Sequence, residues 1–244
     1  MQAKDCNVFE VMIAKLARLS QLGSDDRAAI RTLPVTVSEL AANRPLIREG
    51  QAAGDCHLIL DGYVCRYKLA SNGGRQIVSF HMRGDVIDLQ HMLFNTVDDS
   101  VQTITTVKYA RFPASALRQV AQERPVVAEA LWRDTLVDAS ISREWVMNVG
   151  RRDAKSRVAH LLCEFAMRRE LAGLGSPERF ELPMTQEQIG DATGLTAVHV
   201  NRMIRSLDED GAIVRDHRSI HIADWKNMRQ IADFDPMYLH GTAT

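Results

Sequence analysis

The sequence lacks the features that define secreted and membrane proteins. Its 244 residues include only four cysteines, at positions 6, 56, 65 and 163, and their spacing forms no disulfide framework. No apolar run approaches the roughly 18 residues of a membrane-spanning helix. Charged residues interrupt the first 16 positions, which is not the pattern of a signal peptide. We therefore expect a protein of the reducing cytoplasm.

The sequence also lacks an excess of charge and the motifs of enzymes. Its 30 basic and 31 acidic residues give a formal net charge of −1, so the whole chain offers no electrostatic argument for binding nucleic acid. It contains no glycine-rich phosphate loop, paired-carboxylate motif, metal-spaced histidines or nucleophile elbow. We therefore expect no enzymatic activity from a chain whose length suits about two domains.

Residues 182–207 have the pattern of two short helices joined by a tight turn. Thr185 and Gln188 form a capping box that predicts a helix start, and Gly194 predicts its end. Thr196 can cap a second helix, in which apolar residues recur at helical spacing. These residues are Val200, Met203, Ile204 and Leu207. The pattern favours a helix-turn-helix, whose second helix enters the DNA major groove, although an ordinary pair of helices also fits.

Between residues 35 and 112 the hydrophobic pattern has a period of two. Turn signals, such as Asp61 followed by Gly62, separate short strands, which indicates an antiparallel sandwich or barrel. Residues 84–100 interrupt the pattern and contain a predicted helical turn at 88–94. Two short helices are expected before the strands, within residues 8–33.

A long helix is expected from residue 126 to 149, and Gly150 is expected to end it. Its apolar stripe consists of Val127, Leu131, Ile141 and Trp145. Asp134 and Asp138 interrupt this stripe, which fits a helix packed on its own domain and equally fits a dimer-forming helix. We assign the stripe to a dimer contact. Beyond Gly150 we expect an amphipathic helix, the helix-turn-helix, a hairpin at 211–222 and a last helix capped by Asp224.

In this order the parts resemble the CRP/FNR superfamily of bacterial transcription regulators. The resemblance covers roughly residues 15–225 and rests on residues 58–63, on Gly84 and Asp85, on the helix before Gly150 and on residues 185–202. It implies an α+β fold with an antiparallel β-roll of the jelly-roll type, similar to a cyclic-nucleotide-binding domain, at 1–124. A long dimerisation helix at 125–150 and a winged helix-turn-helix domain at 151–244 follow.

The resemblance also implies the partners. We expect a homodimer that binds a near-palindromic operator in double-stranded DNA, with RNA polymerase as a further partner if the protein activates transcription. The alternative is a ligand-binding regulatory module that acts through protein partners without touching DNA. Arg202 and the winged helix-turn-helix argue against that alternative.

The resemblance places Arg202 at the position of the arginine that reads bases in this family. This position lies in a helix expected at 196–208. Arginine binds guanine O6 and N7 in the major groove. Val198 stands where the family often has a glutamate, and valine favours a thymine methyl group over cytosine N4. We expect DNA contacts from Thr185, Gln186, Thr196, Val198, His199, Asn201, Arg202 and Arg205. Five other basic residues could touch phosphate but fit solvated surface charges better: Arg151, Arg152, Lys155, Arg215 and Arg218.

The corresponding effector pocket comprises Gly84, Asp85, Asp88, Leu89, Gln90, Ser100 and Gln102. Family members that bind cyclic AMP hold its phosphate with an arginine, but residues 88–90 and 100–103 contain no cation here. Members with an iron–sulfur cluster use closely spaced N-terminal cysteines, whereas Cys6 stands alone. The histidines near the strands, His57, His81 and His91, fit structural roles better than haem ligation. We expect none of these three cofactors, and the signal sensed stays unidentified.

Overall fold

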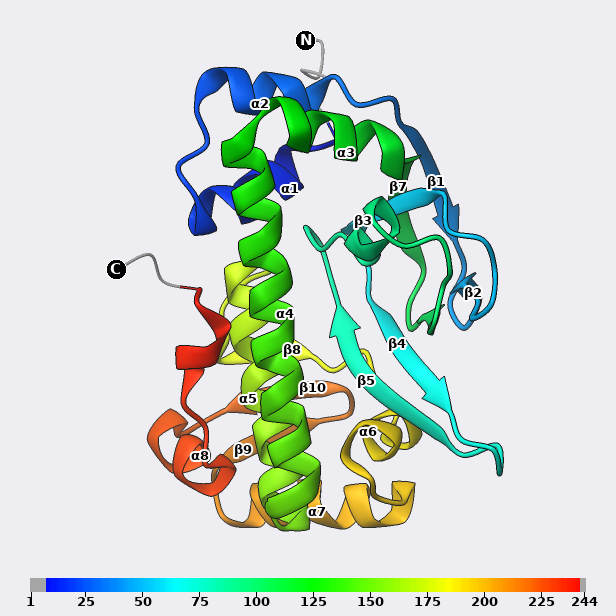
Figure 1. Cartoon of the computed structure of the whole chain (residues 1–244). Helices are drawn as coiled ribbons and strands as arrows, with labels where there is room; N and C mark the ends of the chain where they lie inside the picture. Colours follow the sequence, from blue (N-terminus) through cyan, green and yellow to red (C-terminus); the bar gives the residue numbers. More distant parts are fainter. Residues whose placement is uncertain (1–7, 242–244) are drawn as a thin grey trace, which may run out of the picture. The chain divides into compact units, whose positions relative to one another are not determined.

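The computed structural model describes residues 8–241, whose contacts divide them into two compact units. The first unit holds the described residues up to Arg66 together with Phe80–Asp138 and Gly241, and the second holds Tyr67–Ser79 together with Ala139–His240. A single long helix, α4 (Pro125–Arg151), begins in the first unit and ends in the second (Figure 1). Within residues 8–241, no helix is both long and apolar enough to cross a membrane.

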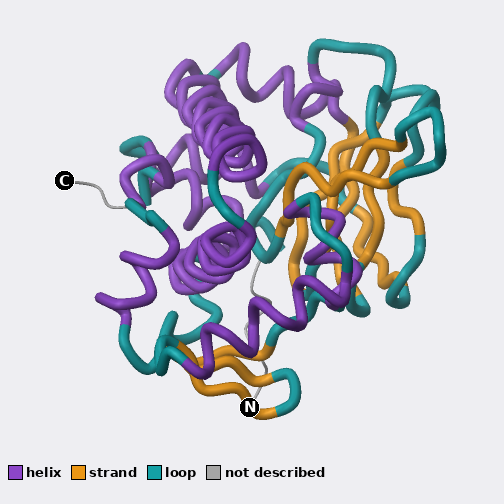
Figure 2. The backbone as a smooth tube through the Cα atoms, turned by 90° about the horizontal axis from the view of Figure 1, so that it is seen from below, coloured by secondary structure: helices purple, strands orange, loops and turns teal. Residues whose placement is uncertain are grey.

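The first unit is built around an antiparallel β-roll with short helices, as the sequence predicts. Its helices besides the start of α4 are α1 (Glu10–Leu19), α2 (Ser24–Arg31), the 3-10 helix η1 (Leu89–Met92) and α3 (Ala114–Glu123). Its strands are β1 (Thr36–Leu40), β2 (Pro45–Ile47), β3 (Asp55–Asp61), the start of β4 (Val64–Leu69), the end of β5 (Arg75–His81), β6 (Ser100–Thr103) and β7 (Val107–Pro113). The sheets have the orders β1-β7-β3 and β2-β6-β4-β5, and Figure 2 draws their strands in orange.

A buried ionic cluster in the first unit joins α1, the turn after β5 and α4. The Lys15 ammonium lies 2.9 Å from an Asp85 carboxylate oxygen and 2.7 Å from one of Asp134. Burial alone would lower the pKa of Lys15, but the carboxylates of Asp134 and Asp85 outweigh it and raise that pKa above its usual value. The cluster explains why a charged residue interrupts the apolar stripe of α4, because Asp134 meets a cation inside the chain.

The apolar stripe of α4 that was predicted to contact a second copy is buried within its own chain. Val127, Leu131, Ile141 and Trp145 are 0%, 5%, 5% and 7% exposed within a single chain. Their side chains pack on their own chain, so they are not available to a second copy. The exposed apolar residues of α4 lie on another face, where Trp132 is 68% exposed and Leu136 is 52% exposed.

Gly150 does not end α4, contrary to our expectation. The helix continues to Arg151, and a Cβ atom added at Gly150 would meet no neighbouring atom within 4 Å. A solvent-facing glycine weakens a helix by about 1 kcal/mol relative to alanine, which the packing of α4 can outweigh. The two compact units divide within α4, between Asp138 and Ala139.

The second unit combines packed helices with a small sheet. Its elements besides the end of α4 are α5 (Ala154–Leu171), β8 (Arg179–Glu181), α6 (Gln186–Thr193), α7 (Ala197–Glu209), β9 (Ile213–Asp216), β10 (Ser219–Ile222), α8 (Trp225–Ala232) and the 3-10 helix η2 (Pro236–Leu239). The sheet has the order β8-β10-β9 with antiparallel pairing. The hairpin β9–β10 directly after α7 is the expected wing. Residues 67–79 also belong here, and Arg75 Nε lies 2.6 Å from an Asp191 carboxylate oxygen of α6.

Candidate nucleic-acid interface

Local hydrogen bonds fix the start of α6, and two glycines shape the turn between α6 and α7. Thr185 Oγ1 accepts from the Gln188 backbone N–H at 3.2 Å, and Gln188 Oε1 accepts from the Thr185 N–H at 2.9 Å, which is the predicted capping box. Gly194 ends α6 with φ 69°, a left-handed conformation that glycine adopts without strain. Gly190 lets the chain cross closely, because an added Cβ would lie 2.4 Å from the Leu195 carbonyl oxygen.

One face of α7 packs inside the second unit and the opposite face is exposed. Val200, Ile204 and Leu207 are 0%, 1% and 0% exposed, so they anchor the helix on the core. Val198 is 82% exposed, and Arg202 follows one helical turn later on the same exposed face. Arg205, three residues further on, is also exposed. The face that the sequence assigns to base reading therefore points away from the core.

The guanidinium groups of Arg202 and Arg205 differ from most other cations of this unit. Within the described residues, neither group forms a hydrogen bond or ion pair. Arg152 is 8% exposed and lies 2.6 Å from Glu144, and Lys155 pairs with Asp210. An exposed arginine with no partner in its own chain keeps all five of its N–H donors available for another molecule.

The wing arginines are also used by their own chain. Arg215 Nε donates to the His217 carbonyl at 3.1 Å, and Arg218 Nη2 donates to the Pro183 carbonyl at 2.8 Å. Arg151 is exposed at the end of α4. These contacts leave α7 as the element with the clearest cationic face.

The remaining predicted contact residues surround the two helix starts. Thr185 and Thr196 are exposed N-caps, and Thr196 Oγ1 accepts from the His199 N–H at 3.2 Å. Gln186, His199 and Asn201 are half-buried. Uncapped backbone N–H groups at a helix start attract anions such as phosphate. The structure thus brings the eight predicted residues to the ends and the exposed side of α6 and α7.

The predicted effector residues are largely occupied by their own chain. Asp85 binds Lys15 and accepts from the Met82 N–H at 3.0 Å. Asp88 is fully buried, accepts from the His57 N–H at 2.8 Å and lies 2.5 Å from His57 Nδ1. A phosphate group needs cationic donors, and these two bound carboxylates supply none.

The other members of that set have structural roles. Gly84 forms a turn with φ 91°, and the hydroxyl of Ser100 accepts from the Glu49 N–H at 3.1 Å. Gln102 pairs with Pro45 in the β2–β6 ladder, and Leu89 and Gln90 are half-buried in η1. We therefore see no arrangement of these residues that fits a cyclic nucleotide.

Arg66 is a largely buried cation of the β-roll that no motif of the sequence marks. Its guanidinium donates to the Asp99 carboxylate and to the Ile87 carbonyl, and its side chain is 15% exposed. The pairing joins β4 to the segment before β6. Alternation along β4 indicates only which face Arg66 occupies, so its partner 33 residues away could not be predicted.

His57, His91, Cys56 and Cys163 have structural roles in the described part of the chain. His57 binds Asp88, and His91 Nδ1 lies 2.9 Å from the Asp55 carbonyl oxygen. Burial raises the pKa of the Cys163 thiol to about 12 and that of Cys56 above its usual range, which keeps both thiols protonated and unreactive. Among residues 8–241, no group of three or more His, Cys, Asp and Glu side chains is placed to hold a metal ion. Cys6 lies outside the described residues.

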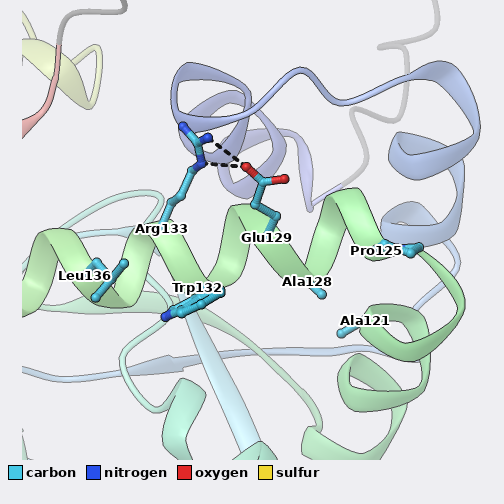
Figure 3. A pocket seen from close by; sticks show the side chains of 7 residues that line it. All are labelled: Ala121, Pro125, Ala128, Glu129, Trp132, Arg133 and Leu136. Carbon is cyan, nitrogen blue, oxygen red and sulfur yellow. Dashed lines mark hydrogen bonds and ion pairs between the residues drawn. The ribbon is translucent and has the colours of Figure 1, made fainter.

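An apolar groove runs along the exposed face of α3 and the first half of α4. It has a volume of about 640 Å³ and is lined by Ala121, Pro125, Ala128, Glu129, Trp132, Arg133 and Leu136. Figure 3 shows Trp132 on the opposite side of α4 from the Arg133 side chain, which is bound to Glu129. Trp132 and Leu136 are its large apolar residues with the most exposed side chains, 68% and 52% exposed.

Comparisons with known proteins agree with this architecture. A family model described as the Crp-like helix-turn-helix domain matches residues 156–231, and one described as the cyclic nucleotide-binding domain matches residues 37–124. The nitrogen fixation regulation protein FixK of Bradyrhizobium diazoefficiens is 30% identical over 175 residues, which cover 71% of this chain and 72% of that protein. The chain belongs to the CRP/FNR family of transcription regulators.

Other CRP/FNR proteins match over more of the chain. The transcriptional activator protein anr of Pseudomonas aeruginosa is 23% identical over 221 residues, which cover 91% of this chain and 88% of that protein. The solved structure of FixK2 from Bradyrhizobium japonicum superposes with a TM-score of 0.75 and 27% identity, and covers 82% of this chain and 98% of that one. This CRP/FNR protein is therefore a DNA-binding regulator and not an enzyme, as expected.

The close approach at Gly190 gives a first prediction about the helix-turn-helix of this regulator. We expect Gly190→Ala to destabilise the second unit by about 1–3 kcal/mol, because the Leu195 carbonyl must move to admit a methyl group. Thermal unfolding should show the lower Tm. The matched control is Gly150→Ala, which meets no neighbour and should raise stability by up to about 1 kcal/mol. Equal Tm values for the two variants would contradict the close crossing.

Proposed function

We propose that this regulator acts as a homodimer in the bacterial cytoplasm and binds a near-palindromic operator through two copies of α7. The observation that carries the proposal is the exposed face with Arg202 and Arg205, which the described part of the chain leaves unpaired. In helix-turn-helix dimers the two recognition helices enter major grooves roughly 34 Å apart. The two-fold symmetry of the protein then sets the symmetry of the DNA site.

We assign base reading to three residues of α7. Arg202 binds guanine O6 and N7 through its two parallel N–H donors. Val198, on the same face, packs against a thymine methyl group and cannot accept from cytosine N4. Asn201 is half-buried and binds adenine or a neighbouring phosphate. The operator therefore differs from one selected by a glutamate at position 198.

The remaining contacts position the protein on the DNA backbone. We assign phosphate contacts to Arg205 and His199 and to the helix starts at Thr185, Gln186 and Thr196. Because few other cations of this unit are unpaired, the salt dependence of binding should be modest for a protein of this class.

We assign dimerisation to the apolar groove of α3 and α4. Ala128, Trp132 and Leu136 recur every four residues and form one stripe of the helix surface. In a two-fold dimer the same stripe of each copy packs against the other. We assign sensing to the part of the chain before α4 and DNA reading to the part after it. If the regulator activates transcription, as the names of several relatives say of those proteins, RNA polymerase is a further partner.

We expect cyclic AMP to leave the DNA affinity of this regulator unchanged. Arg66 of the β-roll already binds Asp99, and the buried Asp88 carboxylate would repel a phosphate group. Gel shifts with a fixed operator, with and without saturating cyclic AMP, measure the effect. An affinity gain of tenfold or more, about 1.4 kcal/mol, would mean that other residues build a nucleotide site.

The experiment that tests the proposed function is selection from a random pool of duplex DNA by gel shift with purified protein. We expect enrichment of an inverted repeat with a guanine at matching positions of both halves. A pool that stays random after repeated rounds would contradict the proposal and favour a module that acts through protein partners alone.

A further inference from the structure

The C-terminal segment after α8 folds back onto α5. Asp233 adopts a left-handed conformation with φ 47°, and residues 233–239, here called the C-terminal clamp, then lie against α5. Phe234 and Leu239 are each 5% exposed. The rings of Phe234 and Tyr238 contact the His160 ring at centroid distances of 5.3 and 5.9 Å. The clamp lies beyond residues 156–231, where the family's helix-turn-helix model matches.

A buried carboxylate joins the clamp to two helices. Glu164 of α5 is 2% exposed, and its two oxygens accept from Trp145 Nε1 of α4 at 3.0 and 3.1 Å. The Tyr238 hydroxyl of the clamp donates a hydrogen bond to the same carboxylate, with an O–O distance of 2.8 Å. Burial raises the pKa of Glu164, which the donors Arg168, Trp145 and Tyr238 oppose. Burying a carboxylate without hydrogen-bond donors costs free energy. Glu164 therefore favours the one arrangement of α4, α5 and the clamp in which its donors reach it.

A second junction joins the same elements through Arg152. Its Nη2 group donates to Glu144 Oε1 of α4 at 2.6 Å and to the Asp233 carbonyl at 2.8 Å. The same Nη2 lies 3.2 Å from an Asp233 carboxylate oxygen. Arg152 lies between α4 and α5, where any change of angle between these helices would occur. The clamp therefore contacts α5 at Glu164, and it contacts the corner between α4 and α5 at Arg152.

The corner connects directly to the helix-turn-helix. Arg157 of α5 donates from Nε to the Arg152 carbonyl at 2.8 Å and from Nη1 to the Thr193 carbonyl at 3.2 Å. Thr193 is the last residue of α6, immediately before the turn at Gly194. A change at the α4–α5 corner would thus move the turn that positions α7.

We infer that residues 233–239 fix the angle between the end of α4 and α5, and so set the position of α7 for DNA reading. This inference rests on the proposed function, in which a homodimer places two copies of α7 on two half-sites. Tyr238 and Glu164 are then positioning residues, because they touch no DNA and act through α5. Loosening the clamp should impair the simultaneous fit of two α7 helices while leaving each helix able to bind alone.

The test uses Tyr238→Phe, which keeps the ring and removes only the hydroxyl that Glu164 accepts from. DNA affinity is measured on the selected inverted repeat and on a duplex in which one half-site is scrambled. We expect the variant to bind the full site about tenfold more weakly, because the buried Glu164 carboxyl group loses one of its donors and the local equilibrium shifts by about that factor. Its affinity for the single half-site should stay at the wild-type value. The matched control is Met237→Ala, a neighbour that is 77% exposed and should change neither affinity.

Two results would overturn the inference. Wild-type affinity of Tyr238→Phe for the full site would mean that the clamp does not position α7. A parallel loss on the full site and the half-site would mean that Tyr238 only stabilises the fold. Failure of the wild-type protein to prefer the full site over the half-site would instead contradict the proposed homodimer function, whatever the variant does.

Discussion

Arg202→Ala should lose specific DNA binding while the protein stays folded and dimeric. A bidentate arginine–guanine contact contributes about 1–3 kcal/mol of discrimination, and a symmetric dimer loses two of them, so affinity for the operator should fall by roughly 30-fold or more. Stability should not change, because the side chain is exposed and has no partner within the described residues. Fluorescence anisotropy with the selected operator measures the loss.

Arg202→Lys separates the charge of this residue from its geometry. Lysine keeps the positive charge but lacks the two parallel donors of a guanidinium group. We expect this variant to retain binding to random DNA and to lose most of its preference for guanine at the matching position. If Arg202→Ala selects the same operator with the affinity of the wild type, the recognition face is assigned wrongly.

Trp132→Asp should convert the dimer to a monomer and thereby abolish tight operator binding. Trp132 is 68% exposed in the apolar groove of α3 and α4, and a carboxylate there would lie unpaired in the interface of two copies. A monomer loses the second binding event, which raises avidity by about 10²–10⁴-fold in a bivalent complex. Sedimentation velocity measures the mass, and anisotropy measures the affinity.

Leu69→Asp provides the control for this substitution. Leu69 is 59% exposed and lies at the end of β4, outside the groove. Leu69→Asp should leave the dimer and the DNA affinity unchanged. That result would show that an added exposed carboxylate does not by itself weaken either one. A dimer of wild-type stability in Trp132→Asp would place the contact between copies elsewhere on the chain.

The helix-turn-helix could be predicted from the sequence because its signals are local. Thr185 and Gln188 are three residues apart, and Gly194 and Thr196 mark the turn and the next helix start. Each signal reflects a hydrogen bond or a backbone angle within a few residues, and the structure has all of them. The exposed face of α7 follows from the spacing of Val200, Ile204 and Leu207 in the same way.

The face of α4 could not be predicted, because periodicity does not say what covers an apolar stripe. Val127 and Leu131 are spaced as a dimer seam would be, but they pack on their own chain. Asp134 looks like a flaw in the stripe until its partner Lys15 is known, and that partner lies 119 positions earlier in the chain. Contacts over such distances leave no local pattern.

The polar contacts inside the β-roll could not be predicted either, because they also join residues far apart in the sequence. Asp88 was expected to line an effector pocket, but it is bound to His57, and Arg66 is bound to Asp99. The junction of Trp145, Glu164 and Tyr238 also joins residues far apart in the sequence. These pairings form only in the folded chain, because the partners lie far apart in the sequence.

Methylation interference on the selected operator tests the central claim most directly. Methylation of guanine N7 blocks the contact assigned to Arg202. We predict interference at one guanine in each half-site, with the two positions related by the two-fold axis and about one helical turn apart, and loss of that interference in Arg202→Ala. Interference that is absent, that occurs in one half only or that persists without Arg202 would contradict the account.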